Sequence, residues 1–252
     1  MRIALVGMGR MGEAVSELAA RRGHEIVARF DEYIDQYPSL PDVPDLPDAL
    51  ASADAIIDFT LPGAVPENIA RYCRWGLPAV IGTTGWYDRL DEVKVLVDKY
   101  DGAVLYAPNF SIGVALLAQV VRSVLPLLDE LPEYDAAVHE VHHIGKADSP
   151  SGTALMLADL IVDGLKRKDH IETETQHGRI DAAALHVTSS RLGGVVGKHD
   201  VSLDSPFDKL VFSHEAKSRR GFAFGAVRAA EWLSGRKGLF TLDDLLAEWL
   251  GS

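Results

Sequence analysis

The chain has 252 residues, of which 47% are hydrophobic and 25% charged, a composition typical of a globular protein with one or two domains. Its formal net charge of -12 at pH 7 argues against a general nucleic-acid binder, which needs a clustered basic surface. The lone Cys73 excludes an intramolecular disulfide. We found neither a signal-peptide pattern nor an apolar run of about 18 residues, and we therefore expect a soluble, cytoplasmic protein without nucleic-acid or membrane partners.

The N-terminal segment has the pattern of a dinucleotide-binding βαβ unit. Residues 2–6 form an apolar run that predicts a buried strand, residues 13–22 have helical spacing, and residues 24–30 predict a second strand. The turn after the first strand contains the fingerprint Gly7-Met8-Gly9-Arg10-Met11-Gly12. We expect its glycines to permit a tight turn and a close approach of the pyrophosphate, with amides of the following helix start facing the phosphates.

Two acidic residues at the end of the second predicted strand indicate which nicotinamide cofactor is used. Asp31 lies where a carboxylate accepts hydrogen bonds from the adenosine ribose hydroxyls. The next residue is Glu32 and not arginine or lysine, so a 2′-phosphate would meet two carboxylates. We therefore predict that NADH is preferred, with NADPH possible.

The following strands each end in small or polar residues. Residues 31–48 are acidic and rich in proline, which indicates an extended loop. Strands are expected at residues 54–60, 78–82 and 103–106, and helices at residues 64–75 and 87–99. The residues at the strand ends are Thr60, Gly82, Thr83, Thr84, Ala107, Pro108, Asn109 and Phe110. Each could be a turn residue or a helix cap, but their repetition at successive strand ends favours contact with the cofactor.

The second half of the chain predicts a different domain. Apolar spacing indicates helices at residues 112–128 and 153–168, with a strand at residues 134–142 between them. Residues 183–190, 199–203 and 209–214 resemble antiparallel strands, and residues 221–233 and 241–250 return to helical spacing.

A dense polar motif joins the predicted strand 134–142 to the next helix. Its sequence is Glu140-Val141-His142-His143-Ile144-Gly145-Lys146-Ala147-Asp148-Ser149-Pro150-Ser151-Gly152-Thr153-Ala154. The strand pleat places Glu140 and His142 on one face and His143 on the other, unless the strand ends near His143. We expect His142 to transfer a proton near neutral pH, Lys146 to supply a positive charge or a second proton, and Asp148 to orient Lys146.

The end of this motif predicts an anion site. Ser151 is a favourable N-cap, and the amides of Ser151, Gly152 and Thr153 at a helix start would hold a carboxylate of a small substrate. A metal site is an alternative interpretation, but adjacent histidines rarely chelate one ion and no HExxH motif is present, so no metal is expected. Surface histidines in a polar turn are a further alternative.

The central motif resembles the E-x-H-H-x-x-K-x-D-x-P-S-G-T-A signature of the dihydrodipicolinate reductase family, also called 4-hydroxy-tetrahydrodipicolinate reductases. The resemblance extends over most of the chain. It includes Gly9-Arg10-Met11-Gly12, Asp58-Phe59-Thr60, Gly82-Thr83-Thr84-Gly85, Asn109-Phe110-Ser111 and residues 219–228. One departure is the glycine turn, GxGxMG, which is one residue shorter than the GxxGxMG often found in the family.

The resemblance implies a nicotinamide-dependent reduction of a small cyclic dicarboxylate in the diaminopimelate and lysine pathway. It implies that His142 is the proton donor or acceptor and Lys146 a second proton donor. His143 would contact substrate, Gly152 and Thr153 would hold a carboxylate, and Arg219 would lie near the cofactor.

The fold implied is α/β: a Rossmann-type parallel sheet domain with an inserted α+β domain for substrate binding and oligomerisation. We expect residues 1–109 and 219–252 to form the first domain and residues 110–218 the second, with a homotetramer formed through the inserted sheet. Closure of the domains over both ligands is also expected, because hydride transfer needs near contact.

Two other functions are compatible with parts of this pattern. A different nicotinamide-dependent dehydrogenase, such as an amino-acid dehydrogenase, would share the glycine turn but would not need the full central motif. A non-catalytic NAD-binding sensor would bind NADH without turnover, and substitution of His142 would leave its function unchanged.

Overall fold

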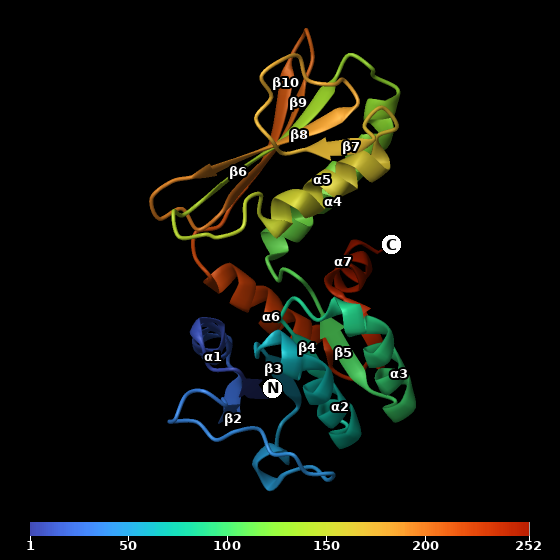
Figure 1. Ribbon diagram of the computed structural model, residues 1–252. Helices are drawn as coiled ribbons and strands as arrows, with labels where there is room; N and C mark the ends of the chain where they lie inside the picture. Colours follow the sequence, from blue (N-terminus) through green and yellow to red (C-terminus); the bar gives the residue numbers. More distant parts are fainter. Residues whose placement is uncertain (252) are drawn as a thin grey trace. The chain divides into compact units, whose positions relative to one another are not determined.

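The computed structural model describes residues 1–251, and these form two compact units (Figure 1). The first unit contains residues 1–112 and the segment that begins at Arg219, and the second contains Gly113–Ser218. The first change of unit therefore falls after Ile112, within the first turn of a helix, and not after Asn109 as the sequence suggested.

The first unit contains a parallel six-stranded sheet in the order β11-β5-β4-β3-β1-β2. Its strands are β1 (Arg2–Val6), β2 (Glu25–Phe30), β3 (Ala55–Asp58), β4 (Ala79–Ile81), β5 (Ala103–Tyr106) and β11 (Gly238–Thr241). Its helices are α1 (Arg10–Arg21), α2 (Val65–Trp75), α3 (Leu90–Tyr100), α6 (Arg220–Leu233) and α7 (Leu242–Leu250). Short 3₁₀ turns are η1 (Asp48–Leu50), η2 (Pro62–Ala64) and η3 (Tyr87–Arg89). The Rossmann-type parallel sheet is confirmed.

Helices cover both faces of this sheet. Helices α2 and α3 contact each other, and their apolar residues join one buried cluster with Val6, Ile56 and Ile81 of the strands. Helix α6 contacts α1 as well as β3, β4 and β5. A strand covered on both faces consists of apolar residues without alternation, which is the pattern seen in β1 and β3. Strand β11 was not expected from the sequence.

The second unit contains a mixed five-stranded sheet in the order β10-β9-β6-β8-β7. Its strands are β6 (Asp135–His142), β7 (His170–Glu172), β8 (Ala184–Arg191), β9 (Lys198–Asp204) and β10 (Lys209–Glu215), and its helices are α4 (Ile112–Asp129) and α5 (Gly152–Gly164). The prediction that residues 183–190 form an antiparallel strand was wrong, because β8 pairs parallel to both β6 and β7. Strand β7 was not anticipated.

Helix α4 has the length and composition of a membrane-spanning helix, with 18 residues and a mean hydropathy of 1.6. The expectation that the chain contains no apolar run of about 18 residues was therefore wrong. Its residues Leu117, Val121, Leu125 and Leu128 are buried in the core cluster of the second unit, where they pack with apolar residues of α5 and the sheet. We therefore interpret α4 as a core helix.

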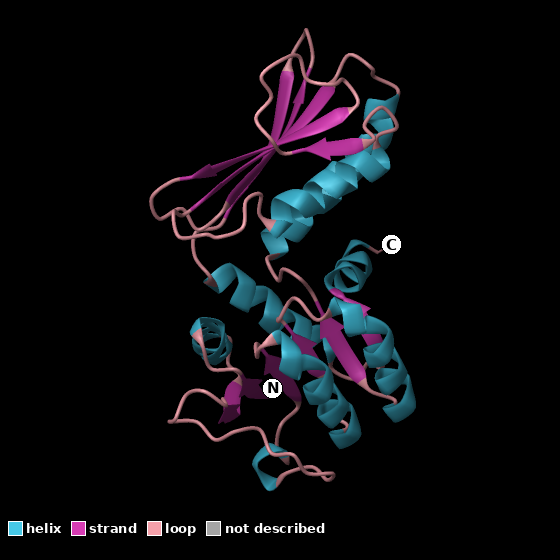
Figure 2. Cartoon of the chain, in the orientation of Figure 1, coloured by secondary structure: helices cyan, strands magenta, loops and turns pink. Residues whose placement is uncertain are grey.

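Helices α4 and α5 pack against one face of the second sheet (Figure 2). Along β6 the side chains alternate, and Ala136, Val138, Glu140 and His142 are buried while the residues between them are partly exposed. Ala136 and Val138 belong to the core that these helices cover. Because of this alternation, Glu140 and His142 lie on the buried face at the end of β6, as expected from the pleat of a strand.

Candidate active site

The glycine turn between β1 and α1 has the geometry that phosphate binding requires. Gly7 has a φ of +87°, and a β-carbon there would lie 2.5 Å from the carbonyl oxygen of Phe59. A β-carbon at Gly12 would lie 2.2 Å from the carbonyl oxygen of Gly7. Gly9 faces open space and is the N-cap of α1, which has no side-chain cap. The start of α1 can therefore donate backbone amides to an anion.

The loops after β3, β4 and β5 lie beside this turn. A β-carbon at Gly82 would overlap the Phe59 ring, and the Phe59 and Phe110 rings are 6.5 Å apart. The Thr83 hydroxyl donates a hydrogen bond to the Thr60 carbonyl at 2.6 Å. The carboxyl ends of the strands thus gather at one edge, where parallel sheets bind dinucleotides.

The predicted cofactor residues of these loops differ in exposure. Thr84 and Pro108 are exposed, Asn109 is half-buried, and Thr83, Ala107 and Phe110 are buried. The side-chain oxygen of Asn109 accepts the amide of Ser111 at 2.8 Å. Their gathering is compatible with cofactor contact, although Thr83 and Asn109 also serve as turn residues.

Asp58 is a buried carboxylate that orders the turn after β3. One oxygen accepts the amide and hydroxyl of Thr60, each at 2.7 Å, and the other accepts the Tyr72 hydroxyl at 2.7 Å and the Asn68 amide at 3.1 Å. Burial raises the pKa of Asp58, whereas these hydrogen bonds oppose that rise. Asp58 therefore fixes the backbone that packs against Gly7.

Asp31 connects the end of β2 to the glycine turn. Its Oδ2 accepts the backbone amide of Met8 at 2.7 Å, and its Oδ1 accepts the amides of Tyr33 and Ile34. Glu32 is exposed. Each carboxylate oxygen can accept two hydrogen bonds, so Asp31 retains capacity for a ribose hydroxyl while it also shapes the turn.

Beside this turn is a hollow of about 560 Å³. Its lining residues are Met8, Glu13, Ser16, Glu17, Arg29 and Tyr37. Arg29 is the one basic residue among them, and its guanidinium donates to the Ser16 hydroxyl at 3.0 Å. The charge around this hollow is therefore more negative than positive.

Arg219 is exposed and immediately precedes α6. The adjacent Arg220 forms an ion pair with Glu17 of α1 at 2.9 Å. The two neighbouring arginines therefore differ in their surroundings. Arg220 forms an ion pair with a residue of α1, whereas Arg219 is the residue at which the chain enters the first unit.

In the second unit, the loop between β6 and α5 brings Lys146 and Asp148 together. Strand β6 ends at His142, and the Lys146 amide donates to the His143 carbonyl at 3.1 Å, which closes a tight turn. Lys146 Nζ lies 2.7 Å from Asp148 Oδ1, as expected for an aspartate that orients the lysine. His143 is half-buried, and a β-carbon at Gly145 would lie 3.5 Å from its Nδ1.

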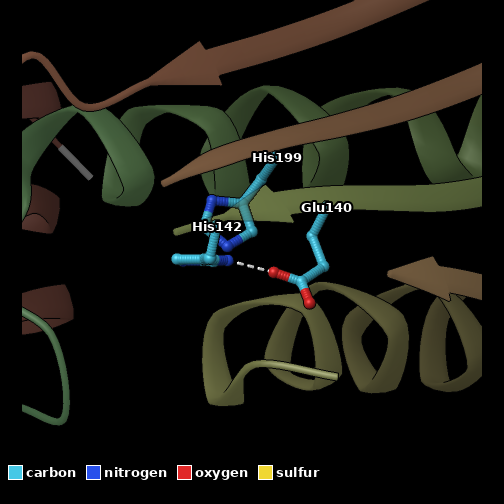
Figure 3. Close-up of side chains that lie close together, drawn as sticks. All are labelled: Glu140, His142 and His199. Carbon is cyan, nitrogen blue, oxygen red and sulfur yellow. Dashed lines mark hydrogen bonds and ion pairs between the residues drawn. The ribbon is translucent and has the colours of Figure 1, made fainter. Parts of the chain in front are cut away.

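His142 lies in a polar cluster with Glu140 and His199 of β9 (Figure 3). Its Nδ1 is hydrogen bonded to Glu140 Oε2, and the other Glu140 oxygen accepts the Arg191 guanidinium at 2.8 Å. Burial lowers the pKa of His142. Glu140 opposes this by favouring the imidazolium, whereas Lys146 and Arg191 lower the pKa further.

The N-terminus of α5 has the predicted cap. Ser151 Oγ accepts the Ala154 amide at 3.2 Å, and it is also hydrogen bonded to His199 Nε2 at 3.1 Å. Because Ser151 is buried and its hydroxyl is used for these two contacts, its side chain acts here as a helix cap. Gly152 is exposed and faces open space, so a carboxylate can approach the helix start.

The groups at this helix start already stabilise one anion, the carboxylate of Asp148. A hydrogen bond from Lys146 lowers the pKa of Asp148, and the backbone amides of Asp148 and Gly152 contribute in the same direction. Lys146 and the Gly152 amide thus both stabilise the Asp148 carboxylate.

The ligand atoms of Glu140, His142 and His199 lie within 4.8 Å of one another, a spacing that a metal ion could use. Both Glu140 oxygens are, however, already hydrogen bonded to His142 and Arg191. The guanidinium of Arg191 and the ammonium of Lys146 would also repel a cation. The hydrogen bonds and the neighbouring cations therefore make this cluster a poor metal site.

The sequence pattern predicts no role for Arg191, His199 or Gly197. For Glu140 it predicts only the face of the strand on which the side chain lies. The pairing of the strands places Arg191 and His199 beside His142 and Glu140. His142 is opposite Arg191 in the β6–β8 pairing, and Glu140 is opposite His199 in the β6–β9 pairing. No local signal marks these residues, because Arg191 is 51 positions from Glu140 in the sequence.

Comparison with solved structures shows that proteins of known structure share this fold. A dihydrodipicolinate reductase from Paenisporosarcina sp. TG-14, solved with dipicolinate bound, has a TM-score of 0.76 at 22% identity over 96% of this chain and 97% of that chain. An amine dehydrogenase from Mycobacterium smegmatis has a TM-score of 0.60 at 10% identity over 96% of this chain and 95% of that one. Both likenesses concern the fold, a parallel-sheet domain with a second domain that contains a mixed sheet.

Sequence comparison identifies the family. The family description "Dihydrodipicolinate reductase, N-terminus" matches residues 1–110, and "Dihydrodipicolinate reductase, C-terminus" matches residues 113–246. The 4-hydroxy-tetrahydrodipicolinate reductase of Christiangramia forsetii is 36% identical over 98% of both chains. That of Natronomonas pharaonis is 39% identical over 97% of this chain and 99% of its own. The chain belongs to the dihydrodipicolinate reductase family, nicotinamide-dependent oxidoreductases of diaminopimelate and lysine biosynthesis, and the predicted resemblance is confirmed.

Proposed function

We propose that this reductase converts 4-hydroxy-tetrahydrodipicolinate to tetrahydrodipicolinate, with NADH preferred as the hydride donor and His142 and Lys146 as the proton-transfer residues. The observation that carries the proposal is the placement of His142 and of the Lys146–Asp148 pair beside the α5 start. This arrangement joins an imidazole, which can carry and release a proton, to a site for a carboxylate.

The reaction needs one hydride and one proton. The nicotinamide supplies the hydride that replaces the hydroxyl of the substrate. The hydroxyl leaves as water, so it must gain a proton from the protein or the solvent. An acid on this chain, close to the bound substrate, would supply this proton, and His142 and Lys146 are the residues that we propose for this role.

The remaining residues of the motif would bind the substrate. The Gly152 and Thr153 amides would hold one carboxylate at the start of α5, where the helix dipole favours negative charge. His143 would contact the ring or the second carboxylate. The half-buried position of His143 supports such a contact, because β6 ends before it.

The pH dependence of the reaction should differ between the free and the substrate-bound enzyme. Burial and neighbouring cations lower the pKa of His142 below 6.5, so its acidic form is lost as pH rises through that lowered value. A bound dicarboxylate places negative charge near the ring and raises this pKa. We expect kcat/KM to decline with rising pH at a lower pH than kcat does. Steady-state kinetics from about pH 5 to 9 measure the decline of kcat/KM and that of kcat. If the two constants declined at the same pH, the result would contradict this role for the substrate charge.

For the cofactor, we propose that Asp31 and Glu32 favour NADH by opposing a 2′-phosphate. The hydrogen bond that Asp31 accepts from the Met8 amide of the glycine turn and the exposure of Glu32 support this proposal, since both carboxylates lie at the end of β2. We expect a higher kcat/KM with NADH than with NADPH, and Glu32→Arg should narrow the ratio by about tenfold. Glu25→Arg, at the exposed start of the same strand, is the control and should leave the ratio unchanged. A wild-type preference for NADPH would overturn the proposal.

We also propose that the protein is a cytoplasmic homotetramer formed through the sheet of the second unit. Helices cover one face of this sheet, whereas the other face carries partly exposed residues such as His139, Asp200 and Val211. An uncovered face of a mixed sheet is a suitable surface for another copy of the chain. Light scattering coupled to size exclusion gives the mass directly.

The experiment that tests the function is a coupled assay. The preceding synthase generates the unstable substrate in situ, and NADH oxidation is followed by absorbance. An amino-acid dehydrogenase would oxidise NADH only with a keto acid and ammonia, and a sensor would bind NADH without turnover. Absence of synthase-dependent oxidation with either nicotinamide would refute the proposed reaction.

A further inference from the structure

We propose that Glu140, held by Arg191, is a positioning residue that fixes the tautomer and the orientation of the His142 ring for proton transfer. This inference rests on the proposed function, because it assigns His142 the proton-transfer role. It concerns two residues that lie behind the reacting group and that would not themselves touch the substrate.

The carboxylate of Glu140 lies entirely inside the second unit, with an exposure of 0%. Burial disfavours its charged form, but hydrogen bonds from Arg191 and the charge and hydrogen bond of His142 outweigh this and lower the pKa of Glu140. Glu140 is therefore ionised at neutral pH. An ionised carboxylate only accepts hydrogen bonds, so His142 Nδ1 must carry a hydrogen.

The other ring nitrogen is consequently the one that exchanges protons. A β-carbon at Gly197 would lie 2.8 Å from His142 Nε2, so a larger residue would press against this nitrogen. Glycine at this position leaves Nε2 accessible. The His199 ring packs edge-on against His142, with centroids 5.1 Å apart, and limits rotation of the imidazole.

Arg191 connects this pair to the loop that carries Lys146. One guanidinium nitrogen donates to Glu140 Oε1 at 2.8 Å, and another donates to the Asp148 carbonyl at 2.5 Å. The planar guanidinium therefore sets the position of the Glu140 carboxylate relative to the backbone of the loop. Lysine at this position would keep the positive charge but could not reproduce the planar pair of hydrogen bonds to Glu140 and to the Asp148 carbonyl.

Glu140→Gln is the most direct test, since it preserves shape and removes charge. Arg191 presents hydrogen-bond donors, so the glutamine oxygen will face Arg191 and its NH₂ group will face His142 Nδ1. Nδ1 must then accept, and the proton of neutral His142 moves to Nε2. We expect kcat to fall by at least about tenfold, because a wrong tautomer disables a catalytic histidine, while KM changes little.

If the role of Glu140 were purely structural, Glu140→Gln would not change the tautomer of His142. Nitrogen chemical shifts of the ¹⁵N-labelled His142 ring, assigned by their loss in His142→Ala, report it directly. We expect an Nδ1–H tautomer in the wild-type protein and an Nε2–H tautomer in Glu140→Gln. Glu130→Gln, at an exposed position that follows α4, is the control and should change neither kcat nor the His142 shifts.

Two variants provide further readouts if Glu140→Gln does not fold. Arg191→Lys should lower kcat with a smaller effect on KM, and Gly197→Ala should disturb the Nε2 shift of His142. The proposal is overturned if wild-type neutral His142 is an Nε2–H tautomer, or if Glu140→Gln retains full kcat. An inactive wild-type enzyme would refute the proposed reaction, whereas the nitrogen shifts would still decide whether Glu140 sets the tautomer.

Discussion

Replacement of His142 by alanine is expected to lower kcat by about 10²-fold or more, the usual contribution of a general acid. His142 is buried at the end of β6, and its Nδ1 is bonded to the ionised Glu140. His199 cannot replace it readily, because burial and the charge of His142 lower the pKa of His199 to about 4 and leave that ring neutral at pH 7. The coupled assay measures the effect on kcat and KM separately.

A suitable control for this variant is His170→Ala. His170 is an exposed histidine of β7 that pairs with Asp169, and its removal should leave kcat unchanged. His142→Ala should retain NADH binding, measured by fluorescence titration, because the predicted cofactor residues belong to the first unit. Near-normal turnover of His142→Ala would exclude this residue as the proton donor.

The first unit could be predicted almost completely because its signals are local. Apolar runs, the glycine turn and the helix spacing gave β1 to β5 and α1 to α3 within a few residues. Strand β11 was missed because it has only four residues, Gly238–Thr241, between two helices. It pairs with β5, a partner distant in the sequence, so its place depends on the assembled sheet.

Strand direction in the second unit could not be predicted from the same kind of pattern. Alternation along a strand indicates which residues face the core, but it is identical for parallel and antiparallel neighbours. Strand β8 is parallel to β6 because α5 returns the chain to the start of β7, and residues 173–183 return it again to the start of β8. The error therefore concerned pairing and not the presence of a strand.

The site shows the same division between local and assembled information. His142, Lys146, Asp148 and Ser151 come from one continuous motif, so their types and spacing were sufficient to select them. Residues that support His142 come from β8 and β9, and the sheet register places them. A sequence pattern thus finds the groups proposed to react, whereas the groups proposed to position them depend on tertiary structure.

Lys146→Ala is expected to lower kcat by roughly 10²-fold, and the arginine variant can show why. Lys146 Nζ lies 2.7 Å from Asp148 Oδ1, so the aspartate orients the ammonium. Lys146→Arg keeps a positive charge, but a guanidinium does not release a proton at neutral pH. If Lys146 donates a proton, Lys146→Arg should restore KM towards the wild-type value without restoring kcat.

The two neighbouring substitutions complete this test. Asp148→Asn should lower kcat less than Lys146→Ala does, because the ammonium remains and only its orientation is relaxed. Lys94→Ala, at an exposed position of α3, should leave both constants unchanged. Full recovery of kcat in Lys146→Arg would show that Lys146 acts as an electrostatic anchor for the substrate. In that case His142, with its Nδ1 bonded to Glu140, would be the one remaining proton donor of the motif.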